Sequence, residues 1–227
     1  MKVKAIIILI AITLVVFSPS SLLAQEATNI QSGIKVGIGL AKWTGEDATS
    51  KGQWTPGASY ERTVAIGLFI GVSISDQLTL QPEVVYLRKS TSYLAGRRRY
   101  YYIIDYLDVP ILAIFKLARS AKISPSLYAG PTISFKLNSE WEPTPEVSIY
   151  SRPELKNVNF IDFGVTVGAS LGFGISRLRM SFDVRITQGI SNITGNQPEF
   201  TDPEELILGG RQDLKNRVIY IMLGLAF

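Results

Sequence analysis

Few residues in this sequence could do chemistry, because histidine and cysteine are both absent. Without them the chain has no disulfides, no thiolate or imidazole metal sites, no cysteine nucleophile and no catalytic triad with an imidazole base. Two carboxylate pairs, Glu140 with Glu142 and Glu204 with Glu205, could bind a divalent ion, but acids in polar connections are usually only solvated. We therefore expect a protein that is not an enzyme and that has no cofactor and no metal.

The densest polar cluster is a run of three arginines, Arg97, Arg98 and Arg99, which is followed by three tyrosines at 100–102. Guanidinium groups bind phosphate oxygens with two parallel hydrogen bonds, and tyrosine rings favour membrane interfaces. The run predicts a rim that contacts lipopolysaccharide headgroups, and an ordinary interfacial anchor explains it equally well. The formal net charge of +4 does not indicate nucleic-acid binding.

The first 24 residues have the layout of a secretory signal peptide. Lys2 and Lys4 form a basic start, an apolar run from Ala5 to Phe17 follows, and Ala24 offers a small residue for cleavage. As a helix the apolar run would span about 20 Å, less than the roughly 30 Å of a bilayer core. We predict a cleaved signal peptide at 1–24, export from the cytoplasm, and one mature domain at 25–227.

The mature sequence alternates between apolar and polar residues with a period of two, which is the pattern of β-strands with one apolar face. Eight segments show it: 33–43, 63–74, 78–89, 102–116, 126–137, 159–173, 178–188 and 217–227. The segment 102–116 is apolar on both faces, and we expect a bulge at Pro110 where its register changes.

The connections between these segments alternate in length. Those at 44–62, 90–101, 138–158 and 189–216 are long and polar, whereas those at 75–77, 117–125 and 174–177 are short. Long external loops and short periplasmic turns are typical of outer-membrane barrels. The predicted fold is all-β, an eight-stranded antiparallel up-and-down transmembrane β-barrel with long extracellular loops and both chain ends on the periplasmic side.

The polar face of the strands decides which face points inward. A soluble lipocalin-like barrel has an apolar interior, whereas a membrane barrel has the two faces exchanged. Glycines within the predicted strands fall on the polar face, as a crowded eight-stranded lumen requires. Because unpaired buried charges are costly, we expect the charges there to form a structural network in the lumen. The predicted members are Lys35, Glu83, Asp108, Lys136, Asp162, Arg179, Asp183 and Arg185.

Aromatic residues near strand ends favour the membrane orientation as a set. Such residues form girdles at the two interfaces of membrane barrels. The predicted girdle residues are Trp43, Tyr86, Tyr106, Phe115, Phe163, Phe173 and Phe227.

Several strings of residues carry a family resemblance. They are "LQPE" at 80–83, "YLDVP" at 106–110 and "AGP" at 129–131, in that order, together with a closing strand that ends in Phe227. With them the mature chain resembles the PorT-like outer-membrane β-barrel family of Bacteroidetes-type bacteria. The resemblance implies an eight-stranded barrel and a terminal Phe227 that acts as an assembly signal for the barrel-assembly machinery. The founding member is associated with type IX secretion and gliding, and the family also holds many barrels of unknown role.

We therefore expect a non-enzymatic protein of the cell outer membrane that acts as a structural or interaction module. The resemblance implies a link to secretion or envelope assembly. The expected partners are outer-membrane lipids including lipopolysaccharide, the barrel-assembly machinery and an envelope or secretion protein, with no nucleic acid. Two alternatives stay open, a narrow outer-membrane channel and a soluble periplasmic lipocalin-like ligand carrier.

Overall fold

The computed structural model describes residues 30–49, 58–95, 98–118, 123–143, 158–175, 178–194 and 213–227. The predicted signal peptide, Arg97 and the pair Glu204 and Glu205 lie outside these ranges. Within the ranges, no helix is long and apolar enough to cross a membrane.

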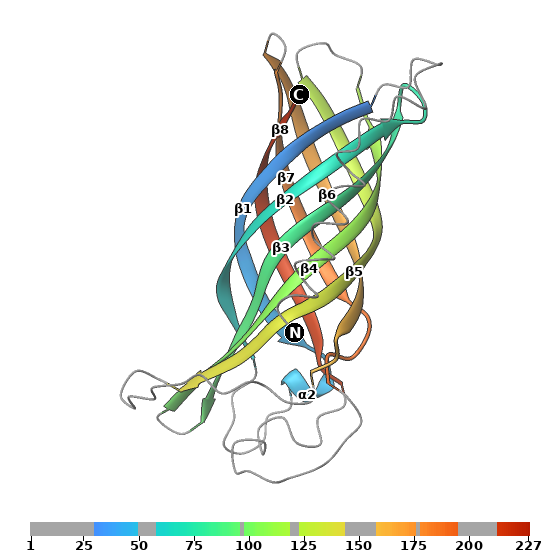
Figure 1. The fold of residues 1–227 in the computed structure, drawn as a ribbon. Helices are drawn as coiled ribbons and strands as arrows, with labels where there is room; N and C mark the ends of the chain where they lie inside the picture. Colours follow the sequence, from blue (N-terminus) through green and yellow to red (C-terminus); the bar gives the residue numbers. More distant parts are fainter. Residues whose placement is uncertain are drawn as a thin grey trace.

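The described residues form eight antiparallel strands that close into a barrel, because each strand pairs with the next and β1 pairs with β8 (Figure 1). The strands are β1 (Ile30–Thr44), β2 (Ser59–Ser73), β3 (Leu78–Ala95), β4 (Arg98–Lys116), β5 (Ile123–Pro143), β6 (Ile161–Ile175), β7 (Leu178–Gly189) and β8 (Lys215–Ala226). A short helix, α2 (Glu46–Thr49), follows β1. Closure leaves the sheet no open edge, as a membrane barrel requires, and the predicted fold is confirmed.

The apolar face of the strands points outward. On β6 the side chains of Phe163 and Val167 are 48% and 43% exposed, whereas Asp162 and Thr166 on the other face are 2% and 0% exposed. The same alternation runs along β1, β2, β7 and β8. An apolar outer wall around a polar interior is the opposite of the arrangement in a lipocalin-like barrel. The alternative of a soluble periplasmic lipocalin-like carrier is therefore excluded.

Glycines on the inner wall make room for larger side chains that fill the lumen. A Cβ added at Gly168 of β6 would lie 2.6 Å from the ring of Tyr128, and one at Gly33 of β1 would lie 2.6 Å from the ring of Phe69. At Gly172, four residues after Gly168, the nearest atoms would be 3.6 Å away, an ordinary contact distance. The lumen is therefore tightly packed around Gly168 and looser at the end of the barrel where Gly172 lies.

This difference predicts a contrast between two alanine substitutions on one strand. Gly168→Ala should lower the free energy of unfolding by about 1–3 kcal/mol, because the Tyr128 ring would have to shift within a filled interior. Gly172→Ala should change it little. Urea unfolding of the refolded barrel in detergent micelles measures both, and equal losses would contradict the described packing.

The predicted long loop at 90–101 is wrong. β3 and β4 continue through it as a hairpin, with Tyr93 opposite Tyr100 and Ala95 opposite Arg98. Tyrosines paired across neighbouring strands stabilise a sheet, which explains why this polar segment stays extended. β5 likewise reaches Pro143, and the ends of these three strands lean away from the barrel at the lower left of Figure 1.

The predicted bulge at Pro110 is also wrong. Pro110 lies opposite Thr132 in regular register, and the irregularity lies instead between Asp105 and Tyr106 of β4, where β4 pairs with β5. Even-numbered residues from 102 to 112 are buried, so one face points inward throughout this part of β4. Both faces looked apolar because the inner one also packs into an apolar cluster, described below.

Candidate functional site

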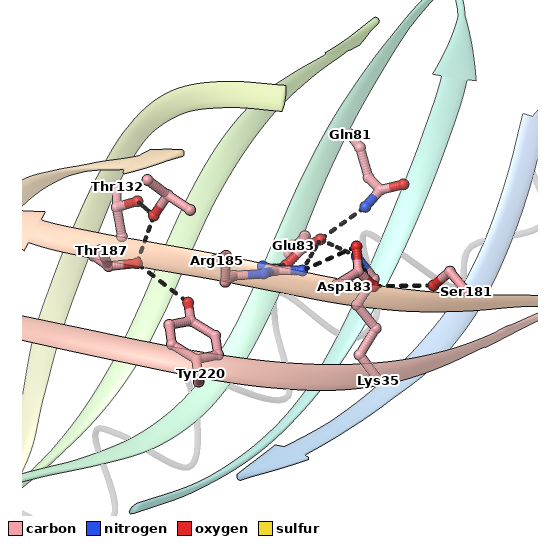
Figure 2. A network of polar contacts seen from close by, with 10 residues as sticks. Lys35, Gln81, Glu83, Thr132, Ser181, Asp183, Arg185, Thr187 and Tyr220 are labelled. Atoms are coloured by element: carbon pink, nitrogen blue, oxygen red, sulfur yellow. Dashed lines mark hydrogen bonds and ion pairs between the residues drawn. The ribbon is translucent and has the colours of Figure 1, made fainter. Parts of the chain in front are cut away.

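Four charged side chains meet inside the barrel (Figure 2), and we call them the four-charge cluster: Lys35, Glu83, Asp183 and Arg185. Glu83 accepts hydrogen bonds from Lys35 Nζ at 2.8 Å and from Arg185 Nη1 at 2.7 Å. Asp183 lies 3.5 Å from Lys35 Nζ and 3.9 Å from Arg185 Nη2. Two positive and two negative side chains, each at most 4% exposed, make the cluster neutral.

Neighbouring side chains complete the environment of the four-charge cluster. Gln81 donates to Glu83 at 2.7 Å, and Ser181 donates to Asp183 at 3.0 Å. The guanidinium of Arg185 lies 5.3 Å from the ring centre of Tyr128 and 5.5 Å from that of Tyr220, within cation–π range. Buried ions stabilise a fold only when such partners satisfy them. With these partners in place, the four-charge cluster links β1, β3 and β7 across the lumen.

A chain of hydroxyl groups follows the inner wall of the barrel next to the cluster, on its extracellular side (Figure 2). Thr166 of β6 shares hydrogen bonds of 2.7 Å with Thr132 of β5 and of 2.7 Å with Thr187 of β7. Thr187 in turn lies 3.2 Å from the hydroxyl of Tyr220 on β8. We call these four residues the hydroxyl chain. It ties four neighbouring strands together and occupies the space beside Arg185.

A second buried ion pair uses a residue that the sequence analysis missed. Lys89 Nζ lies 3.0 Å from Asp108 and donates to Ser134 at 2.9 Å, and its charge lies over the ring of Tyr106 at 4.3 Å. Lys89 and Glu83 are separated by an even number of positions on β3, so their side chains lie on the same face of the strand. This spacing could have predicted that Lys89 points into the lumen.

The remaining predicted network residues are placed differently. Asp162 is buried but accepts hydrogen bonds from Ser191 and Asn216, both at 2.7 Å, instead of facing a cation. Lys136 is half-buried and donates to the carbonyl of Val158 at 2.9 Å. Arg179 is exposed. Both Lys136 and Arg179 lie outside the two clusters, and Arg179 stands at the start of β7, where solvent surrounds its charge.

An apolar cluster fills the extracellular end of the lumen. Three of its aromatic residues, Trp43, Tyr93 and Tyr102, have ring centroids 5.2–6.1 Å apart. We call the whole set the apolar cap: Trp43, Ala48, Tyr93, Tyr102, Ile104, Tyr106, Val158, Ile193 and Leu214.

The apolar cap corrects two of the predicted girdle residues. Trp43 and Tyr106 are 2% and 0% exposed, so they belong to the interior. Tyr86 is half-buried. The other predicted girdle residues, all on the outer wall and at least 36% exposed, are Phe115, Phe163, Phe173 and Phe227.

The periplasmic end of the lumen is open. A cavity of about 310 Å³ lies there, bordered at its inner end by Lys35 and Asp183 and lined further out by Lys116, Arg179 and several serines. Water can therefore enter from the periplasm as far as the four-charge cluster. Among the described residues, no group of three or more acids could hold a metal ion.

The predicted rim and assembly residues lie at opposite ends of the barrel. Arg98 and Arg99 begin β4 at the tip of the extended hairpin, and Arg99 is exposed. Phe227 lies at the periplasmic end, where its N–H donates to the carbonyl of Ser32 at 3.0 Å. The roles assigned to these residues stay predictions.

A closed eight-stranded barrel with an apolar outer wall and an ion-paired interior defines a transmembrane β-barrel protein. The family model described as "Outer membrane protein beta-barrel domain" matches residues 23–195. The chain belongs to this family and is a protein of the bacterial outer membrane.

Comparisons with solved structures found outer-membrane proteins of low sequence identity. One is Ail of Yersinia pestis in complex with the heparin analogue sucrose octasulfate, with 11% identity, 87% of this chain and 99% of that chain covered, and a TM-score of 0.44. OprG of Pseudomonas aeruginosa has 11% identity, coverage of 87% and 94%, and a TM-score of 0.46. Neisserial surface protein A has 10% identity, coverage of 86% and 97%, and a TM-score of 0.44. A comparison with curated proteins found no match.

Proposed function

We propose that this protein is a closed, non-conducting outer-membrane barrel that acts as a structural or interaction module, and is neither a channel nor an enzyme. The observation that carries the proposal is the filling of the lumen at three successive levels. From the periplasm outward these are the four-charge cluster, the hydroxyl chain and the apolar cap.

Each level opposes the passage of a solute for its own physical reason. An eight-stranded barrel is only just wide enough for its own side chains. An ion entering from the periplasm would have to separate buried ion pairs, and breaking such a pair costs about 3–5 kcal/mol. Beyond them it would meet the apolar cap, whose mostly hydrocarbon side chains replace little of the hydration that the ion would lose.

The interaction half of the proposal concerns the extracellular side, where β3, β4 and β5 extend furthest. Their ends present the exposed Arg99 and the half-buried Tyr101, residue types that suit polar and aromatic contacts with an envelope partner. Membership of the PorT-like group, a link to secretion or envelope assembly, and export through a signal peptide cleaved near Ala24 are parts of this proposal. They rest on the sequence strings and on the layout of the first residues.

Conductance in planar bilayers tests the closed lumen. We expect the wild-type protein to give no steady current. The triple variant Trp43→Ala, Tyr102→Ala, Arg185→Ala removes side chains from two of the three levels and should give current, which also shows that insertion succeeds. Val165→Ala, on the lipid-facing wall, is the control and should stay silent. Steady, ion-selective current through the wild-type protein would favour the narrow channel instead.

Crosslinking in intact cells tests the interaction module. A photo-crosslinking residue in place of the exposed Arg99, near the tip of the β3–β4 hairpin, should trap a defined envelope protein. The same residue at Asp76, in the periplasmic turn between β2 and β3, is the control and should not trap that protein. Absence of any adduct at position 99, or the same adduct at both positions, would contradict an extracellular contact surface.

A further inference from the structure

The apolar outer wall ends abruptly in a cation on three neighbouring strands. On β1 the outward-facing Leu40 is followed towards the extracellular side by Lys42, on β2 Val64 is followed by Arg62, and on β8 Ile219 is followed by Arg217. We call Lys42, Arg62 and Arg217 the cation arc. It lies where the lipid-facing band meets the outer headgroup layer.

Two like charges of the cation arc occupy opposite positions on paired strands. Lys42 lies opposite Arg217 in the β1–β8 pairing, and Arg62 lies opposite Leu40, one outward-facing position away from Lys42. Like charges directly opposite each other on neighbouring strands destabilise a sheet. The arrangement is therefore unfavourable unless an anion shares the site.

Within the part of the chain that the structure describes, no acid forms an ion pair with a residue of the cation arc. Arg217 Nε donates to the amide oxygen of Gln188 at 2.6 Å, and Lys42 Nζ lies 4.5 Å from the ring centre of Tyr60. Two other cations do form ion pairs with acids: Arg88 lies 2.8 Å from a carboxylate oxygen of Asp105, and Lys215 lies 2.6 Å from one of Asp213. The arc thus carries three positive charges with no counter-ion among the described residues, and neutral groups orient two of them, Lys42 and Arg217.

We propose that the cation arc binds the phosphate groups of a phosphorylated glycolipid of the outer leaflet. Arginine forks match phosphate oxygens with two parallel hydrogen bonds, and lysine adds a third positive charge. The acyl chains would lie against the wall directly below, where Leu40, Val64 and Ile219 are 46%, 59% and 40% exposed.

The direction of these side chains favours a lipid over a soluble acidic protein. All three stand on the parity that faces the membrane, directly above apolar residues, so they project sideways from the barrel wall into the headgroup layer. A soluble partner approaching from outside would meet the strand ends first. The inference rests on the outer-membrane location and not on the closed lumen, so it survives if the barrel proves to conduct.

Binding of lipid A to the purified full-length mature barrel in detergent tests the proposal, with native mass spectrometry counting bound lipids. The wild-type protein should bind diphosphorylated lipid A tightly and the dephosphorylated form weakly. The double variant Lys42→Gln, Arg217→Gln should lose about tenfold or more in affinity for the diphosphorylated form, because each charge-assisted contact is among the stronger ones. Arg62→Gln, outside the like-charge pair, should lose less and gives a second variant if the double variant folds poorly.

A matched control removes the same number of cations from the other end of the barrel. Lys116→Gln, Arg179→Gln at the periplasmic mouth should leave lipid A affinity unchanged. In phosphate-free detergent the Lys42→Gln, Arg217→Gln barrel should be at least as stable to urea as the wild type, because a repulsion has been removed. Equal affinity in wild-type and arc variants, equal losses in arc and control variants, or indifference of the wild type to phosphorylation would each overturn the proposal.

Discussion

Replacing Arg185 with alanine is expected to lower the free energy of unfolding by about 3–5 kcal/mol. Arg185 supplies a short ion pair to Glu83, and both side chains are completely buried. Without the guanidinium, Glu83 keeps the hydrogen bond from Gln81 and one cation, Lys35, which it shares with Asp183. The cluster would then hold two carboxylates and one ammonium, which leaves an uncompensated negative charge next to Glu83, whose side chain is 0% exposed.

Two further variants separate this electrostatic cost from loss of volume. Replacing both members of the pair, Glu83→Leu with Arg185→Leu, leaves Lys35 and Asp183 as a neutral pair and should cost less than Arg185→Ala alone. Arg179→Ala, at the exposed periplasmic mouth, should cost almost nothing. Urea unfolding of the refolded barrels gives all three free energies. A double variant that is less stable than Arg185→Ala would show that the four charges do not act as a neutral unit.

Val167→Arg is expected to destabilise the barrel by about 2–4 kcal/mol when it is embedded in lipid. Val167 stands in the middle of the outward-facing side chains of β6, between Val165 and Ala169, and is 43% exposed. A guanidinium at this depth would lose its water without gaining a partner, and the nearest interface is several residues away along the strand.

The preceding residue provides the control for Val167→Arg. Thr166→Ser keeps the hydroxyl that contacts Thr132 and Thr187, so its effect on stability should be small. Refolding titrations in lipid vesicles compare the two variants. Equal effects would mean that the inward and outward faces of β6 have been exchanged.

The strand order and the direction of each face could be predicted because two different environments act on alternate residues. Lipid selects the apolar side chains of β1, β2, β6, β7 and β8, and a narrow lumen selects glycines and charges on the other parity. That alternation is visible without any knowledge of which strand residues lie opposite each other.

The partners inside the lumen could not be predicted, because they depend on strand register. Lys35 and Glu83 lie on strands separated by β2, and Arg185 reaches Glu83 across the lumen, so no spacing in the sequence reveals these contacts. Trp43 and Tyr106 were misplaced for a related reason: an aromatic residue near a strand end suits either a lipid girdle or an apolar cap. The hairpin at 90–101 was missed because its extended form depends on pairing between its own two halves.

The unequal lengths of the strands have a mechanical consequence. β3, β4 and β5 contain 18, 19 and 21 residues, whereas β7 and β8 contain 12 each, and the strands meet at similar levels on the periplasmic side. The extracellular ends of the strands therefore lie at different heights, and β3, β4 and β5 project furthest on one side of the barrel. A force that a partner applies to these projecting strand ends acts away from the barrel axis. It therefore produces a torque that tilts the barrel in the bilayer, instead of pushing it along the membrane normal.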